Sequence, residues 1–161
     1  MSWTAGVTKN TGDLITSAIW NNYMGAGGSI DYLKGMIVWL DTPVQVVAQT
    51  NKTSDIAYTD VDLTADTSAN AAIAMLQLHV HIDSIASGSV YLRVRKNGTT
   101  PTYPPYIFWG DYYLTEGDYI ENIVGSVLCG LDTGQIFEYN LDVAGTIKVD
   151  AYINLLGYIN G

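Results

Sequence analysis

The feature that most constrains the fold of this chain is a strict alternation of apolar and polar residues within 72–98. Apolar residues take every second position at 76–82 and again at 90–94. A period of two is typical of strands with one buried and one solvated face. We therefore expect a central antiparallel hairpin whose turn is formed by residues 84–88. The residues that would face one another across it are Ile82, Val80 and Leu78 in the first strand and Val90, Leu92 and Val94 in the second. A slip of one residue would expose one apolar set, so the register is strongly specified.

Short β-branched and aromatic runs bounded by turn residues continue along most of the chain. They lie at 36–40, 44–49, 57–63, 119–131, 137–143 and 147–155. About eight or nine strands with turns every 8–12 residues favour an all-β fold, an antiparallel β-sandwich of the jelly-roll type. We expect two parts, an N-terminal arm and short helix at 1–35 and the β-sandwich at 36–161.

Three local features refine this expectation. The tripeptide at 144–146 contains Gly145, which predicts a tight hairpin between the last two strands. Gly125 predicts a bend or bulge in the strand region 119–131. The residues at 99–118, which begin with a proline-rich run, are expected to form an aromatic loop.

The N-terminal segment contains aromatic residues but no strand pattern. Trp3 stands in a polar, Gly- and Thr-rich arm, and Ile19, Trp20 and Tyr23 share one face of a short predicted helix that Thr16 can cap. A helix this short buries little alone and must pack against another surface. We therefore expect Trp3, Ile19, Trp20 and Tyr23 to pack against the sandwich of the same chain or against a partner such as a sister subunit.

Composition excludes several partners. The 161 residues have a formal net charge of −9 and only 14% charged residues, with 12 Tyr. An acidic chain lacks the basic footprint of a protein that binds nucleic acid or an anionic membrane. The N-terminus has no signal-peptide pattern and no apolar run is long enough to span a membrane, so we expect synthesis in a cytoplasm. The single cysteine, Cys129, is expected to be a small core residue.

Two polar motifs have ordinary structural explanations. Asp132-Thr133-Gly134 matches the active-site tripeptide of aspartic proteases, but the same residues are common in turns between strands. His79 and His81 lie at the i, i+2 spacing that can bind zinc on a strand. The expected hairpin, however, places Arg93 opposite His79, which disfavours a cation. We interpret the histidines as polar-face residues that form hydrogen bonds across strands, and we predict no metal and no cofactor.

The predicted loop combines aromatic and acidic residues. Its possible contact residues for a glycan or a protein are Tyr103, Tyr106, Trp109, Tyr112 and Tyr113. Glu116, Asp118 and Glu121 follow, and paired carboxylates beside aromatic residues are the components of a glycosidase. An acidic solvated loop explains the carboxylates equally, and sugar binding without hydrolysis needs only flat rings and hydrogen-bonding groups. We predict a protein that is not an enzyme.

Several segments resemble tailed-bacteriophage virion structural proteins. The N-terminal signature is Thr-Gly-Asp-Leu-Ile-Thr at 11–16, followed by Trp20-Asn21 and later Tyr32-Leu33. Similar patterns occur at 91–98, 134–139 and 156–159. The glycine-rich residues 25–28 depart from versions with a continuous helix. The resemblance implies a virion protein made in the host cytoplasm and located on the exterior of the particle.

Together these features favour a capsid decoration, or cement, protein. The resemblance implies the major capsid protein or other virion proteins as partners and a homo-oligomer, expected to be a trimer. The alternative is a head- or tail-fibre module that binds host glycan through the aromatic loop.

Overall fold

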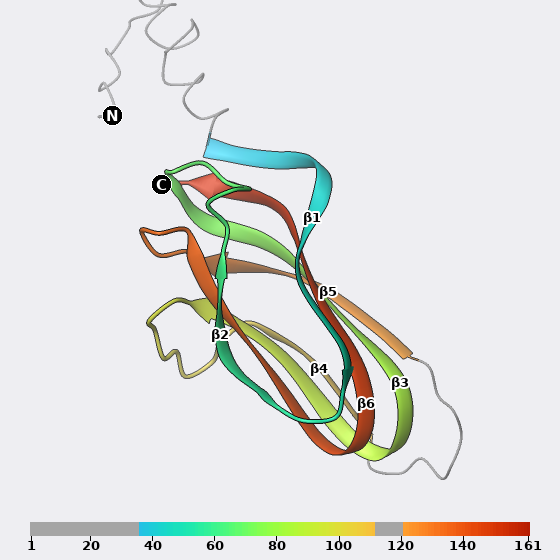
Figure 1. Ribbon diagram of the computed structural model, residues 1–161. Coiled ribbons are helices and arrows are strands. Elements are labelled where there is room, and N and C mark those ends of the chain that lie inside the picture. The colour runs from blue at the N-terminus through green and yellow to red at the C-terminus, as the bar shows by residue number, and fades with distance from the viewer. Residues whose placement is uncertain (1–35, 112–120) are drawn as a thin grey trace, which may run out of the picture. The chain divides into compact units, whose positions relative to one another are not determined.

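Two long antiparallel strands, β3 (Ala71–Lys96) and β6 (Ile136–Asn160), organise the fold (Figure 1). They pair along almost their whole length, from Ala71 opposite Asn160 to Lys96 opposite Phe137. Both strands turn back near their middle. In β3 the turn lies at the register shifts between Ile82 and Gly88, and in β6 it lies near Gly145, which pairs with Gly88. The two strands therefore contribute to both layers of the molecule.

The protein is described by a computed structural model that covers residues 36–111 and 121–161, with the side chains of 84–87, 109–111 and 121 outside that description. The remaining strands are β1 (Ile37–Lys52), β2 (Ile56–Asp62), β4 (Tyr106–Asp111) and β5 (Glu121–Gly130). In the described part no helix is long and apolar enough to cross a membrane.

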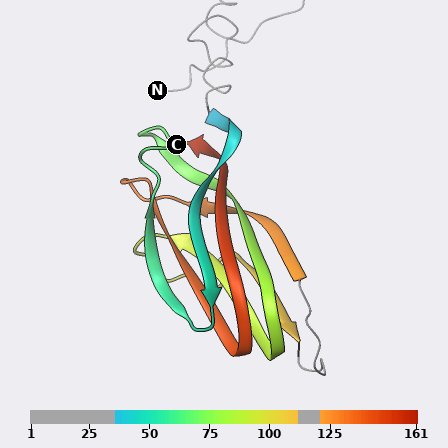
Figure 2. The same cartoon turned by 45° about the vertical axis from the view of Figure 1, so that its right-hand side comes forward.

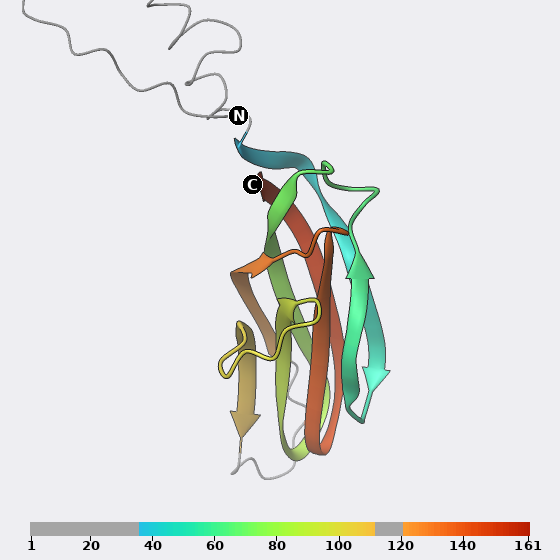
Figure 3. The same ribbon diagram turned by 90° about the vertical axis from the view of Figure 1, so that its left-hand side faces the viewer.

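The strands form two layers packed face to face (Figure 2). One layer, called here the β5 layer, contains β1, the C-terminal half of β6, the N-terminal half of β3, and β5. The other, the β4 layer, contains β2, the N-terminal half of β6, the C-terminal half of β3, and β4. Figure 3 shows the layers from the side, with β1 and β2 toward one edge and β4 and β5 toward the other. Two layers of four strand segments in this order form a jelly roll, so the predicted fold class is confirmed.

The core lies between the layers and is made of the inward-facing residues of all six strands. Its largest fully buried side chains are Phe137, Leu63, Leu76, Leu78, Ile82, Leu92, Leu141, Ile153 and Leu155. Burying one such aliphatic side chain stabilises the fold by about 1.5–3 kcal/mol. The layers also share a polar contact, because the Gln49 amide of β1 donates a 2.7 Å hydrogen bond to the hydroxyl of Tyr139 on β6.

The predicted central hairpin is wrong in its pairing. Leu78 and Leu92 lie on the same strand, β3, in opposite layers, and both halves pair with β6 instead of with each other. The apolar side chains do point into one core, as predicted. Alternation specifies which face is buried, but it does not distinguish two strands paired in one sheet from two strands packed across a core.

Other predicted boundaries change for similar reasons. The tight hairpin predicted at 144–146 is a turn-back within β6, where Gly145 adopts a left-handed conformation with a φ of 87°. The runs at 36–40 and 44–49 form one strand, because β1 continues through Pro43 at the edge of the sheet. The predicted aromatic loop contains a strand, β4.

Gly125 does not mark a bulge, because the pairing of β5 with β3 is unbroken there. Gly125 instead allows the layers to approach, since a Cβ at this position would lie 2.7 Å from Cγ2 of Ile107 on β4.

Candidate contact surface on the β4 layer

Three outward-facing residues of β3 form the centre of a surface on the β4 layer. Tyr91, Arg93 and Arg95 occupy alternate positions, opposite to the buried Leu92 and Val94. Because directly paired residues of antiparallel strands point to the same face, each has outward-facing neighbours. These pairs are Tyr91 with Phe108 and Asp142, Arg93 with Tyr106 and Asn140, and Arg95 with Glu138.

The aromatic platform consists of Tyr91, Tyr106 and Phe108. The ring centroids of Tyr91 and Phe108 are 4.4 Å apart, and those of Tyr91 and Tyr106 are 5.8 Å apart. These distances are typical of favourable aromatic pairs. Tyr106 is 52% exposed and Phe108 is 45% exposed. Both rings therefore contact Tyr91 and are also accessible to solvent.

Arg93 connects this platform to polar groups of β6. Its guanidinium carbon lies 4.4 Å from the centroid of the Tyr91 ring. The same side chain donates hydrogen bonds of 2.9 Å to Asn140 Oδ1 and 3.0 Å to Asp142 Oδ2. Cation–π contact and hydrogen bonding together hold the guanidinium in place beside the Tyr91 ring.

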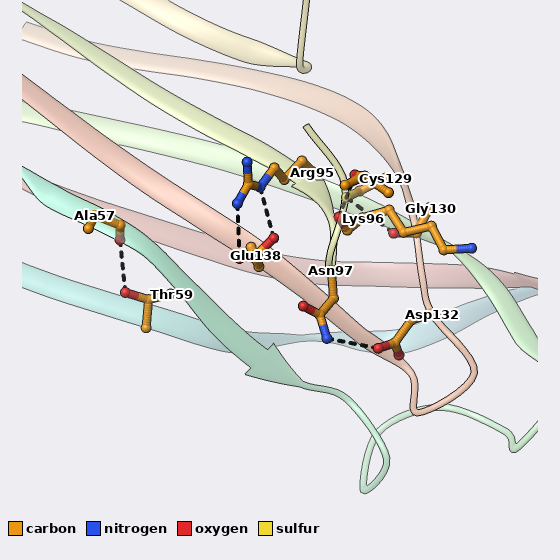
Figure 4. A network of polar contacts seen from close by, with 10 residues as sticks. Ala57, Thr59, Arg95, Lys96, Asn97, Cys129, Gly130, Asp132 and Glu138 are labelled. Carbon is orange, nitrogen blue, oxygen red and sulfur yellow. Dashed lines mark hydrogen bonds and ion pairs between the residues drawn. The ribbon is translucent and has the colours of Figure 1, made fainter. Parts of the chain in front are cut away.

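Arg95 forms a second ordered pair on the same face (Figure 4). It donates to both carboxylate oxygens of Glu138, at 2.8 and 3.1 Å, and its guanidinium carbon lies 3.6 Å from the Tyr58 ring centroid. The hydrogen bond to Glu138 raises the pKa of Arg95. Glu138 is only 9% exposed, so the bidentate pair satisfies a carboxylate that would be costly to bury alone.

This surface is chemically suited to contact, because it combines flat rings with polar groups that are already in position. Tyr and Phe supply large contact area with few rotatable bonds, so binding costs little conformational entropy. A hollow of about 420 Å³ lies elsewhere, between β1 and β2, and is lined in part by Gln49, Asp60 and Tyr139.

The two histidines lie on the outer face of the β5 layer, where their predicted cross-strand hydrogen bonds are confirmed. His79 Nε2 and His81 Nδ1 lie 2.9 and 3.1 Å from the same atom, Oδ1 of Asn122 on β5. The predicted position of Arg93 opposite His79 is wrong, since His79 pairs with Tyr152 and Arg93 belongs to the other layer. Within the described residues, no group of three or more His, Cys, Asp or Glu side chains is placed to hold a metal ion.

Asp132-Thr133-Gly134 forms a turn, as the structural interpretation predicts. Asp132 Oδ1 accepts hydrogen bonds from the backbone N–H groups of Gly134 (2.8 Å) and Ile136 (2.9 Å). Its Oδ2 accepts one from the Asn97 amide at 2.8 Å (Figure 4). These hydrogen bonds lower the pKa of Asp132, and the one from the Ile136 N–H group has the largest effect.

Cys129 is a buried core residue, also as predicted. Burial raises the pKa of its thiol to about 12, so the thiol is neutral and a poor nucleophile at ordinary pH.

Most of the predicted contact residues lie outside the described part of the chain. These are Trp3, Ile19, Trp20, Tyr23, Tyr112 and Tyr113, the acidic residues Glu116 and Asp118, and the side chains of Trp109 and Glu121. Of the rest, Tyr106 belongs to the aromatic platform, whereas Tyr103 is 88% exposed and has no ring partner among the described residues.

Sequence reasoning missed Tyr91 and Arg93 as members of this candidate surface. The available signal was the alternation of Tyr91, Arg93 and Arg95 on β3 with Tyr106 and Phe108 at the same spacing on β4. It became informative only once the pairing of β3 with β4 was known.

Comparison with known proteins adds the following. No protein-family model matches the chain, and no curated protein matches it. Seven chains of solved structures match. One is a protein of Bacillus endospore appendages, described as a novel family of disulfide-linked pili, with 11% identity and a TM-score of 0.41 over 79% of this chain and 93% of that one. A likeness at this level carries no inference about what this chain does.

Proposed function

We propose that this chain is a non-enzymatic structural protein of a tailed-phage virion, a capsid decoration protein that binds the outer capsid surface as an oligomer. One observation carries the structural role: the outer face of the β4 layer is an exposed aromatic platform whose neighbouring charges are already paired with one another. Such a face favours stable contact with another macromolecule over chemistry on a small one.

The virion assignment is supported by the sequence resemblance. The signature at 11–16, with Trp20-Asn21 after it, is the most specific part of that resemblance. In this proposal Trp3, Ile19, Trp20 and Tyr23 dock to the major capsid protein or to a sister subunit, and the jelly roll faces outward. A net charge of −9 suits a position on the exterior, away from packaged DNA.

A second candidate function is glycan binding by a head- or tail-fibre module. The observation that favours it is the position of the exposed Tyr106 and Phe108 rings beside Arg93, Asn140 and Asp142. Flat rings can stack on the apolar face of a sugar, while amide, carboxylate and guanidinium groups bind its hydroxyls.

Two variants of the full chain distinguish these functions. Trp20→Ala removes a predicted docking side chain, and Phe108→Ala removes an exposed ring of the aromatic platform. Gln45→Ala, at an exposed position of β1, is the matched control. Virions of the source phage are stripped of the protein and re-decorated with each variant, and the same variants are applied to a glycan array.

If the decoration function holds, Trp20→Ala lowers capsid occupancy about tenfold or more. Phe108→Ala lowers it as well, because the aromatic platform contributes contact area, and the control binds like the wild type. Wild-type occupancy by Trp20→Ala would overturn docking through that helix. Absence of the protein from purified virions would overturn the virion assignment altogether. Glycan signals lost only in Phe108→Ala would establish the second function instead.

A further inference from the structure

Each layer of the jelly roll ends in edge strands, and edge strands are places where another chain can add. Within the part of the chain that the structure describes, β5 pairs only with β3, so its second edge has no partner there (Figure 2). An open edge presents a row of unpaired N–H and C=O groups. Proteins commonly prevent pairing at such edges with short strands, proline, charged side chains or bulges.

Three of the four edge strands carry such features. β1 contains Pro43, which removes a backbone donor. β2 has a register irregularity between Ile56 and Thr59 and ends in acidic residues. β4 has only 6 residues and directly follows Pro105.

β5 has a charged residue only at its first position, Glu121, and otherwise carries none of these features. It has 10 residues, its pairing with β3 is regular, and no charged residue or proline occurs from Asn122 to Gly130. Its outer face exposes two large apolar side chains, Val124 (56% exposed) and Leu128 (58% exposed). In a chain with a net charge of −9, this uncharged edge is where two copies can approach with little repulsion.

The backbone geometry shows which groups point to the open edge. The N–H of Leu131 donates to the carbonyl of Ala72 at 2.8 Å, continuing the register of β5 with β3. In an antiparallel strand, the backbone N–H and C=O groups of successive residues point alternately to the two edges of the strand. The odd-numbered residues of β5 therefore form backbone hydrogen bonds with β3. The N–H and C=O groups of Val124, Ser126 and Leu128 therefore point to the open edge, while their side chains lie on the outer face.

We propose that β5 pairs antiparallel with β5 of a second copy of this chain, about a two-fold axis at Ser126, so that the β5 layers of both copies become one continuous sheet. This register sets Val124 opposite the partner subunit's Leu128, twice in each dimer. A register centred on Gly125 would place Ser126 opposite Val124, and Leu128 opposite Asn122. A register centred on Val127 would place Ser126 opposite Leu128, and Val124 opposite Gly130. Of these three registers, only the one centred on Ser126 sets both exposed apolar side chains opposite an apolar side chain, and it is isologous, as in most dimers.

The first test uses charge at the two facing positions in the full chain. Val124→Lys with Leu128→Lys places like charges opposite each other, whereas Val124→Lys with Leu128→Glu places opposite charges there. The first variant changes the net charge from −9 to −9 + 2 = −7, which weakens general repulsion, and the second leaves it at −9 + 1 − 1 = −9. Any loss of association in the first variant is therefore local.

Sedimentation equilibrium measures the dimer dissociation constant, and circular dichroism confirms that the variants fold. We expect a wild-type dimer, a Lys/Lys variant with about tenfold or greater weakening, and a Lys/Glu variant restored to within a few fold of the wild type. A monomeric wild type would overturn the proposal. Equal association of the two charge variants would overturn it as well, because the contact would then lie elsewhere on the molecule.

Cross-linking tests the register itself. Hydrogen-bonded residues on paired antiparallel strands have Cα atoms about 5.5 Å apart, which is within the range of a disulfide. Ser126→Cys should therefore form a covalent dimer on mild oxidation, and the buried Cys129 does not compete. Gln45→Cys on β1 is the control and should remain monomeric on a non-reducing gel. Equal cross-linking of both variants would contradict the two-fold axis at Ser126.

Discussion

At the scale of single residues, Asp132 shows how one carboxylate fixes a turn between strands. It accepts backbone hydrogen bonds from Gly134 and Ile136 and a side-chain bond from Asn97, which follows β3. These bonds lower the pKa of Asp132 because they stabilise its charged form. The carboxylate joins the start of β6 to the end of β3.

Asp132→Asn keeps a hydrogen-bond acceptor but removes the charge, so we expect it to destabilise the fold by about 1–2 kcal/mol at neutral pH. The folded-state pKa of Asp132 is lower than its ordinary value of 3.8, so its contribution is complete above that value and is lost as pH falls through the folded pKa. The difference between wild type and variant in urea denaturation should therefore shrink as the pH falls below 3.8. A difference that stays constant over the whole range would contradict this role.

The residue scale also shows what sequence can and cannot predict about the contact surface. The turn role of Asp132 and the burial of Cys129 followed from residue type and neighbouring pattern. The contact of Tyr91 with Phe108 did not, because a stack of two rings depends on which strands are neighbours. Tyr106 was recognised only as an aromatic residue in a loop, and its place in a strand was missed.

At the scale of elements, strands β4 and β5 are joined across the core by a close approach. The side chain of Ile107 on β4 lies close to Gly125 on β5. A Cβ atom added at Gly125 would lie 2.7 Å from Ile107 Cγ2. The sequence signal of an isolated glycine in a strand was correct, but its cause was close packing and not a bulge. Periodicity likewise located most strands but did not predict which strands pair. A strand has the same buried face whether its apolar neighbour lies beside it in one sheet or across the core.

Gly125→Ala should destabilise the fold by about 1–3 kcal/mol, because the added methyl group overpacks the contact with Ile107. Ile107→Ala alone should also destabilise, by leaving a cavity. In the double variant the new methyl group occupies part of that cavity, so the combined loss should be smaller than the sum of the two. Chemical denaturation of all four proteins measures this coupling, and strict additivity would show that the two positions do not meet.

At the scale of the whole molecule, the layers share their central strands. Each half of β3 pairs with a half of β6, and both halves continue into the other layer without a chain break. Neither layer is therefore a separate folding unit. This could not be predicted from local pattern, since it depends on pairs as distant in sequence as Ala71 and Asn160.

Leu92→Ala, in the core of the β4 layer, should lower the free energy of opening for amide hydrogen exchange by about 2–5 kcal/mol. We expect the same decrease in both layers. The readout is amide exchange at Leu92 neighbours in the β4 layer and at Leu78 and Ile153 in the β5 layer. Gln45→Ala, at an exposed site of β1, is the control and should change little. Protection that falls in the β4 layer alone would contradict a shared cooperative unit.

The pairing of β3 with β6 has a consequence for how the chain is made. On a translating ribosome, β3 emerges long before β6, and the segment between them, which contains β4 and β5, must be synthesised before β3 and β6 can pair. Contacts this distant form slowly. Until then the apolar face of β3 is open to water and to other nascent chains, so correct production depends on what shelters that strand during synthesis.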